Sequence, residues 1–207
     1  RSPVVSVALL YRSGLNDEPS TLVGVNRVVA GMLTESTGHL SPGEYRSILE
    51  TYGGETSVEV APDVVFFSDS FSSNLLKGAI WLASERAYGF REDTAAYQQV
   101  LEQIRREDAA RSEDLSGRED EALRGMVRTV NLRLVPEVAA LDSGMTMQAA
   151  KAYESLYFSP KKAVLAVSGD VHPDSVRKYV VEMFSLLPPD TVQVELNPTV
   201  FSVGDAV

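Results

Sequence analysis

Alternating apolar and polar positions predict the strands of this chain. Val4 to Tyr11 is a valine-rich run with small residues between larger ones, which favours a strand. Two further alternating segments, residues 56–61 and 64–71, are joined by Pro62-Asp63 and predict an antiparallel hairpin. A short apolar run at residues 163–168 predicts a buried strand.

Apolar residues that recur three and four positions apart predict the helices. In the first of them, Val25, Val29 and Met32 fall on one helical face. The second opens with Ser41-Pro42 and with Glu44, which are the residue types of a capping box followed by a proline in the first turn. The predicted helices cover residues 20–34, 41–52, 75–88, 93–130, 147–157 and 173–186.

The order of these elements predicts the fold class. Strands and helices neither alternate singly nor separate fully, which favours an α+β fold. We expect a mixed, largely antiparallel sheet with helices packed mainly on one face. Residues 1–188 are predicted to form a single domain, and residues 189–207 a linker or the start of a following domain. Because the chain begins at Arg1 in a near-continuous strand pattern, we expect it to be a fragment whose upstream residues, including any signal peptide, are missing.

The charge balance of the chain argues against nucleic acid as a partner. The chain has 207 residues and a net charge of −10, so its field repels phosphate backbones. The pair Arg105-Arg106 stands beside Glu107-Asp108 and is typical of a solvated helix face, so no nucleic-acid partner is expected. The apolar runs are too short to span a membrane. The absence of cysteine excludes disulfides, thiolate zinc sites and cysteine nucleophiles.

Common catalytic patterns do not occur in the sequence. It contains no G-x-S-x-G, P-loop or G-x-G-x-x-G string. Its two histidines, His39 and His172, stand in turn-like loops, and neither has a second histidine at ligand spacing. We interpret both as loop residues. Asp170 and Asp174 flank His172 and are interpreted as capping residues of the last helix.

A family resemblance is carried by strings that follow one another along most of the chain. They are YRSGLNDEPSTLVGVNRVVAGMLTEST, LETYGGETSVEVAPDVVFFSDSF, AYQQVLEQIRRED and YESLYFSPKKAVLAVSGDVHPDSV. Each string is weak alone, but their order and spacing resemble one half of a pitrilysin/insulinase-type metallopeptidase. The resemblance implies an inverted zincin motif, H-x-x-E-H, in which two histidines bind zinc and the glutamate acts as general base. It also implies a third ligand, a glutamate, from the later long helix.

The residues at the implied zinc positions are of the wrong type. Arg27 and Gly31 stand at the histidine positions, and Ala30 at the position of the base. The third-ligand position falls on Gln103, with Glu102 and Glu107 close by. Alanine and glycine have no donor for a metal, and arginine stays protonated. We therefore expect a degenerate, non-catalytic member that binds no zinc and no other cofactor.

The resemblance also implies a peptide-binding edge strand after the double glycine. In active relatives a peptide adds to this edge as an extra strand. Here the stretch is Gly54, Glu55, Thr56, Ser57 and Val58, and Ser57-Val58 replaces the family's asparagine-alanine step. The alternative is an ordinary paired strand without a ligand.

Three functions follow from the resemblance. In the first, the domain pairs with a homologous zinc-bearing half, as a dimer or two-half assembly, and helps to form or close a peptide-binding chamber. In the second, it is a structural subunit of the respiratory-complex core type. The third, an active zinc endopeptidase with a shifted site, requires a residue cluster that the sequence does not show. The family places such proteins in the bacterial envelope, outside the cell or in mitochondria, and the sequence does not choose between these.

Overall fold

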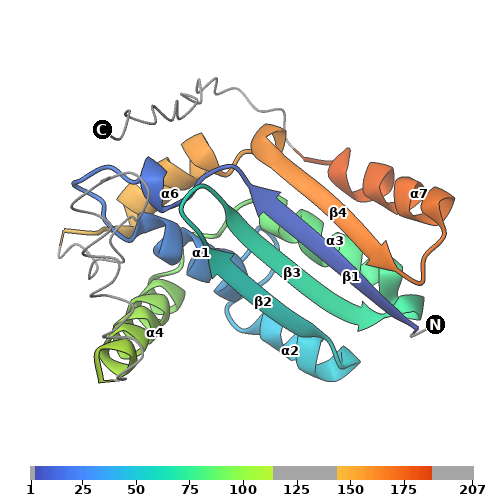
Figure 1. The fold of residues 1–207 in the computed structure, drawn as a ribbon, viewed down its shortest axis with the longest axis horizontal. Helices are drawn as coiled ribbons and strands as arrows, with labels where there is room; N and C mark the ends of the chain where they lie inside the picture. Colours follow the sequence, from blue (N-terminus) through green and yellow to red (C-terminus); the bar gives the residue numbers. More distant parts are fainter. Residues whose placement is uncertain (1–2, 114–143, 188–207) are drawn as a thin grey trace, which may run out of the picture.

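A single sheet organises the fold. The computed structural model describes residues 3–113 and 144–187. Strands β1 (Val4–Tyr11), β2 (Glu55–Val60), β3 (Val65–Ser72) and β4 (Ala163–Gly169) lie in the order β2-β3-β1-β4 (Figure 1). Each neighbouring pair of these strands is antiparallel. Among the described strands, the first in sequence, β1, therefore lies between the β2-β3 hairpin and the last in sequence, β4.

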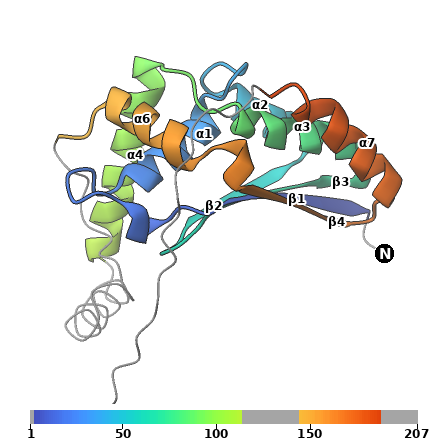
Figure 2. The same cartoon turned by 90° about the horizontal axis from the view of Figure 1, so that it is seen from above.

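Helices cover one face of this sheet. Figure 2 shows the described helices on one side of the strands, and none of the described helices covers the other side. The described helices are α1 (Val25–Glu35), α2 (Glu44–Tyr52), α3 (Leu76–Ala87), α4 (Thr94–Glu113), α6 (Met147–Tyr157) and α7 (Pro173–Phe184). The predicted α+β class with helices on one face is confirmed, and the described strands pair antiparallel throughout. None of the described helices is long and apolar enough to cross a membrane.

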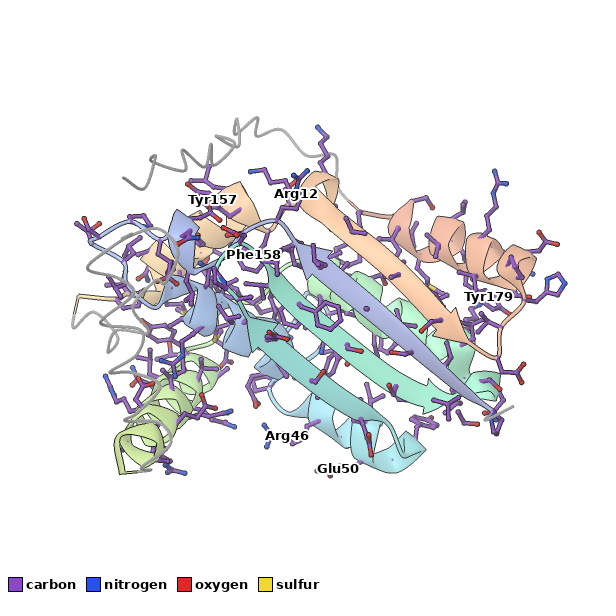
Figure 3. All side chains as sticks on the ribbon, viewed as in Figure 1. Arg12, Arg46, Glu50, Tyr157, Phe158 and Tyr179 are labelled. Atoms are coloured by element: carbon purple, nitrogen blue, oxygen red, sulfur yellow. The ribbon has the colours of Figure 1, made fainter. Side chains whose placement is uncertain are left out.

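Side chains along each strand alternate between the face of the sheet that the helices cover and the open face. In β1, Val5 and Leu9 are buried under the helices, whereas Ser6 and Ala8 are partly exposed on the open face. The buried apolar residues form two groups. One lies under α1, α4 and α6, and the other under α2, α3 and α7. Phe158, labelled in Figure 3, belongs to the first group, and its ring centroid lies 5.0 Å from that of Tyr11.

The starts of two helices differ from the prediction. Helix α1 begins at Val25 and not near residue 20, and α2 begins at Glu44 and not at Ser41. In each case the preceding residue is a glycine with a left-handed backbone, Gly24 at φ 86° and Gly43 at φ 78°. The predicted capping box is therefore wrong, although the Ser41 amide still donates to the Glu44 carboxylate. The predicted helical residues 114–130 and the predicted linker 189–207 lie outside the described residues.

A buried arginine connects the sheet to α2 and α3. The Arg86 side chain of α3 is 1% exposed, and its guanidinium donates through both terminal nitrogens to Asp69 of β3. Tyr45 of α2 donates to the same carboxylate at 2.6 Å. Arg86 Nη2 also donates to Thr56 Oγ1 at 3.1 Å, so this network holds the edge strand β2 as well.

Two glycines give opposite expectations for substitution by alanine. Gly53 ends α2 at φ 64°, where any side chain strains the backbone. Gly78 lies inside α3, and an added Cβ there meets no atom within 4 Å. We expect Gly53→Ala to lower the free energy of unfolding by about 1 kcal/mol, and Gly78→Ala to raise it by about 0.5–1 kcal/mol. Urea unfolding of both variants measures this, and shifts of the same sign would contradict the backbone argument.

Candidate functional site

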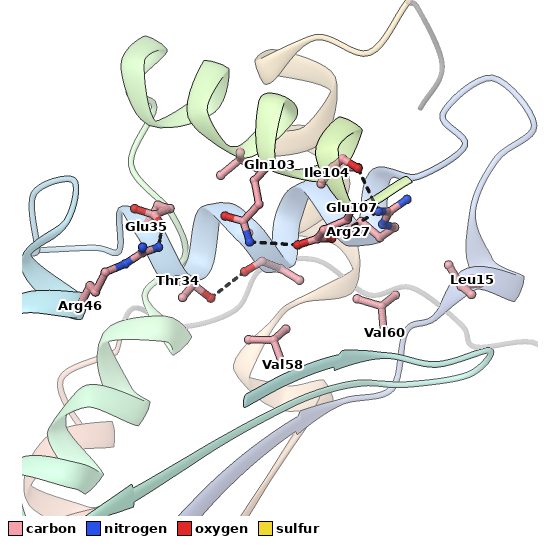
Figure 4. A pocket seen from close by; sticks show the side chains of 13 residues that line it. Leu15, Arg27, Thr34, Glu35, Arg46, Val58, Val60, Gln103, Ile104 and Glu107 are labelled. Atoms are coloured by element: carbon pink, nitrogen blue, oxygen red, sulfur yellow. Dashed lines mark hydrogen bonds and ion pairs between the residues drawn. The ribbon is translucent and has the colours of Figure 1, made fainter. Parts of the chain in front are cut away.

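A pocket of about 310 Å³ lies between α1, α4 and β2 (Figure 4). It brings together the motif positions that the sequence singles out. The lining residues are Leu15, Arg27, Ala30, Gly31, Thr34, Glu35, Arg46, Val58, Val60, Val100, Gln103, Ile104 and Glu107. Arg27, Ala30, Gly31 and Gln103 are all among them.

Helical spacing explains why these residues meet. On α1 the lining residues are spaced three, four, seven and eight positions from Arg27, and on α4 three, four and seven positions from Val100. Such residues share one face of a helix. Val58 and Val60 stand two apart on β2 and therefore point to the same side of the sheet. The pocket is thus the place where one face of each helix meets the covered side of the edge strand.

Arg27 connects α1 to α4. Its side chain is 10% exposed. Its Nη1 lies 2.7 Å from Oδ1 of Asp108, and its Nη2 lies 3.4 Å from both Oε2 of Glu107 and the Ile104 carbonyl oxygen. Gln103 Nε2 donates to the other oxygen of Glu107 at 3.0 Å. A fixed guanidinium therefore neutralises the carboxylates that α4 brings to this end of the pocket.

Gly31 of α1 packs closely against Val100 of α4. A Cβ at this position would lie 2.6 Å from Cγ1 of Val100 and 3.2 Å from Cγ2. Valine in a helix has one strongly preferred rotamer, so it cannot easily swing away. The space that a side chain at position 31 would need is therefore occupied by α4.

A second ion pair, between Glu35 and Arg46, lies at the other end of the pocket. Glu35 at the end of α1 is buried and accepts a hydrogen bond from Arg46 of α2. Gln99 of α4 lies near the same carboxylate, with Nε2 at 3.4 Å from Oε2. Arg46 and Glu50 project from α2 at the outer margin of the molecule (Figure 3). Each charged side chain that lines the pocket is thus paired within the wall.

A polar cluster fixes the start of α1. The Glu18 carboxylate accepts hydrogen bonds from the amides of Gly24 at 2.8 Å and Asn26 at 2.9 Å. Burial raises the pKa of the Glu18 carboxyl, and these two hydrogen bonds act in the opposite direction. Asn26 also donates to the Tyr153 hydroxyl of α6 at 3.2 Å. These contacts fix the position of the first turn of α1, the helix that carries Arg27, Ala30 and Gly31.

The chain is similar in sequence and in fold to known proteases. No family model matches the sequence. The sequence is 25% identical over 189 residues to "Zinc protease PqqE" of Helicobacter pylori, a match that covers 85% of this chain and 40% of the relative. The structure is similar to a protease from Helicobacter pylori, with a TM-score of 0.77, 20% identity and coverage of 97% of this chain and 49% of that one.

Periplasmic protease PqqL from Escherichia coli is also similar. The crystal structure of its first half has a TM-score of 0.83 at 17% identity, and the match covers 96% of this chain and 44% of that one. The full PqqL structure gives a TM-score of 0.85, with 23% of its length covered. The sequence is thus similar to that of a zinc protease, and the structure has the fold of part of pitrilysin-like peptidases, about half of the Helicobacter pylori protease and about a quarter of PqqL. The chain spans half or less of the length of each of these relatives.

The residues of this half-domain do not fit the zinc ion that the family implies. Zinc in proteins is held by several nitrogen, sulfur or carboxylate ligands. The pocket contains no histidine, and its two carboxylates, Glu35 and Glu107, each face an arginine. Within residues 3–113 and 144–187, no group of three or more His, Cys, Asp or Glu side chains is placed to hold a metal.

The remaining candidate residues lie elsewhere. Glu102 pairs with Arg106 on the exposed side of α4, away from the pocket lining. His39 Nδ1 lies 3.0 Å from the buried carboxylate of Glu85, and the His39 side chain is 65% exposed. His172 is 74% exposed beside Asp174. The two histidines therefore lie in loops, and the pocket includes neither of them.

The predicted peptide-binding stretch, residues 54–58, consists of Gly54 and the first four residues of the edge strand β2. Within the described chain, β2 pairs with β3 alone, and Glu55, Thr56 and Ser57 are exposed. Val58 faces the pocket, whereas Gly54 lies so close to the Phe71 ring that an added Cβ would be 2.3 Å from it. The glycine at position 54 is thus explained by its packing against the Phe71 ring. Residues 55–58 have no second strand partner within the described residues, and this edge of the sheet lies next to the pocket.

Several pocket residues were not predicted from the sequence. They are Leu15, Thr34, Glu35, Arg46, Val60, Val100 and Ile104. The helical spacing from Arg27 and Gln103 would have indicated the α1 and α4 members. Arg46 could not be found in this way, because it reaches the pocket from a separate helix.

The Arg27 contacts predict a measurable stability difference between two arginines. We expect Arg27→Met to lower the free energy of unfolding by about 1–2 kcal/mol, because it removes the guanidinium, 10% exposed, that contacts both Asp108 and Glu107 of α4. The matched control is Arg106→Met, which removes an exposed pair with Glu102 and is expected to cost less than about 0.5 kcal/mol. Equal losses in urea unfolding would show that Arg27 does not connect the helices.

Proposed function

We propose that this half-domain is non-catalytic and pairs with a homologous zinc-bearing half to form or close a peptide-binding chamber. The observation that carries the proposal is the pocket itself. The positions for both zinc-binding histidines, the base and the third ligand converge there, and they are filled by Arg27, Gly31, Ala30 and Gln103. Ala30 cannot take a proton from water, and the other groups cannot assemble a zinc site.

The comparisons support the pairing. The chain covers 49% of the Helicobacter pylori protease and 44% of the first half of PqqL, so each of these proteins has a further region at least as long as this chain. A half that keeps its fold but lacks a metal site can still contribute to a peptide-binding chamber when another half binds the metal. The partner is therefore a pitrilysin-type half with an intact H-x-x-E-H string, in the same polypeptide or in a second one.

Co-expression tests the pairing. The chain is produced together with each pitrilysin-type half of its source genome that has the intact motif, and the mass of the product is measured by light scattering. We expect a complex with one copy of each half, and peptide cleavage that needs both. A complex without cleavage would instead support the structural-subunit alternative. A chain that stays alone, with zinc-bearing halves that are fully active without it, would overturn both functions.

A further inference from the structure

The two edge strands of the described sheet differ in composition. Strand β2 contains Glu55 and Glu59, and charged residues of this kind protect an edge strand against further pairing. Strand β4, with the sequence AVLAVSG, contains neither a charged residue nor a proline. Within residues 3–113 and 144–187, however, β4 pairs with β1 alone. The composition of β4 is that of a strand with a neighbour on both sides.

The backbone of β4 has hydrogen-bonding groups that point away from β1. The amide of Asp170, directly after β4, donates to the Val4 carbonyl oxygen at 3.0 Å. In an antiparallel strand, successive residues direct their N–H and C=O groups to opposite sides. The even-numbered residues of β4 therefore bond to β1, and the amides of Leu165 and Val167 point to the outer edge. No other strand among the described residues pairs with them there.

The apolar core is incompletely covered beside β4. Leu165 and Val167 lie opposite Leu9 and Val7 of β1, on the face of the sheet that the helices cover. Leu9 and Val7 are each 1% exposed, whereas Leu165 and Val167 are only partly buried. Helix α7 contains no fully buried residue. Its apolar residues that pack against the second core group are all partly buried, namely Val176, Tyr179, Val180, Met183 and Phe184.

The position of α7 indicates what kind of segment fits this edge. Figure 1 shows α7 beside β4 on the side away from β1, and Figure 2 shows it on the face that the helices cover. The helix runs back along β4, so that its end lies near the start of the strand. A strand parallel to β4 at the outer edge would complete a right-handed β-α-β unit, the hand that almost all such crossovers have.

The sequence after α7 contains a segment with the pattern of such a strand. Helix α7 ends at Phe184, and apolar and polar residues alternate in the segment TVQVEL at residues 191–196. Residues 185–190 connect the two, and connections of about two to six residues are usual between a helix and the next strand. Pro188 and Pro189 in this connection prevent the helix from continuing.

We propose that residues 191–196 add to the outer edge of β4 as a parallel fifth strand beneath α7, with Val192, Val194 and Leu196 on the helix side. The segment is then part of this domain and not the linker that the sequence analysis expects from residue 189. With β4 paired on both sides, a partner cannot extend the sheet there, and β2 remains as the open edge of the described strands. The inference does not depend on the proposed function.

Amide hydrogen exchange on the full chain, followed by NMR, tests this pairing. The matched reference is the other edge, where the Ala61 amide donates to the Val64 carbonyl oxygen, so that by the same alternation the Val58 amide points outward. We expect the Leu165 and Val167 amides to exchange about tenfold or more slowly than the Val58 amide, after correction for intrinsic rates. Exchange as fast as at Val58 would overturn the inference.

Two double variants with the same change in charge identify the occupant of the edge. Val192→Asp with Val194→Asp places carboxylates on the helix side, and we expect the protection of Leu165 and Val167 to be lost. Thr191→Asp with Gln193→Asp changes the opposite side of the segment, and we expect the protection to remain. Protection that survives the first variant, or that rises with protein concentration, would show another occupant or a second copy at β4 and would overturn the inference.

Discussion

Replacing Arg86 by methionine is expected to lower the free energy of unfolding by about 3–5 kcal/mol. Asp69 is fully buried, and Arg86 is its cation. Without the guanidinium, the carboxylate keeps the Tyr45 hydroxyl but has no charge partner. Thr56 of β2 also loses its contact, so the edge strand should loosen. Urea unfolding gives the energy, and hydrogen exchange at the β2 amides reports on the edge.

A second variant separates the charge from the packing. Changing Asp69 to leucine together with Arg86→Met removes both charges, and this double variant should recover most of the loss, because no unpaired charge stays buried. If the single and double variants are equally unstable, the loss comes from shape and not from the uncompensated carboxylate.

Restoring the family motif is expected to destabilise the half-domain without creating a zinc site. The triple variant Arg27→His, Ala30→Glu and Gly31→His returns both histidines and the base. A side chain at position 31 would begin 2.6 Å from Cγ1 of Val100. Overpacking of this kind costs about 1–3 kcal/mol. The glutamate at the buried position 30 and the loss of the Arg27 ion pairs add to the cost.

The steric part of this expectation has its own control. Adding Val100→Ala to the triple variant opens the space beside position 31 and should recover part of the stability. Zinc bound per chain is measured by equilibrium dialysis for both variants. Stoichiometric zinc on the triple variant with Val100 in place, at unchanged stability, would show that α1 and α4 separate readily and that the Gly31 contact is not a barrier.

Local patterns were sufficient to predict most of the fold. The strand at Val4–Tyr11 and the helix at Met147–Tyr157 have the predicted bounds, because alternation and helical spacing are strong there. The predicted start of α2 was wrong because the helix begins after Gly43, whose backbone is left-handed. The pattern of apolar residues gives no information on such a backbone conformation. The Arg86 network was not predicted, since an arginine in a helix pattern ordinarily indicates the exposed face.

The candidate site could be predicted in part. The family resemblance supplied Arg27, Ala30, Gly31 and Gln103, and the structure places all of them in one pocket. It did not supply the partners that close the site. Asp108 and Val100 belong to α4, and Arg46 belongs to α2, and their distances to α1 depend on how the helices pack. Pairings between residues far apart in sequence follow from tertiary contacts and not from local periodicity.

We expect this half-domain to perform no zinc-dependent hydrolysis by itself. The direct measurement is cleavage of an unstructured peptide mixture by the purified chain after incubation with zinc, with and without a chelator. We expect no cleavage in either condition, because Ala30 offers no base and the pocket offers no ligand set. Cleavage that the chelator abolishes would contradict it and would direct the search for ligands to His39, His172, Glu102 and Glu107.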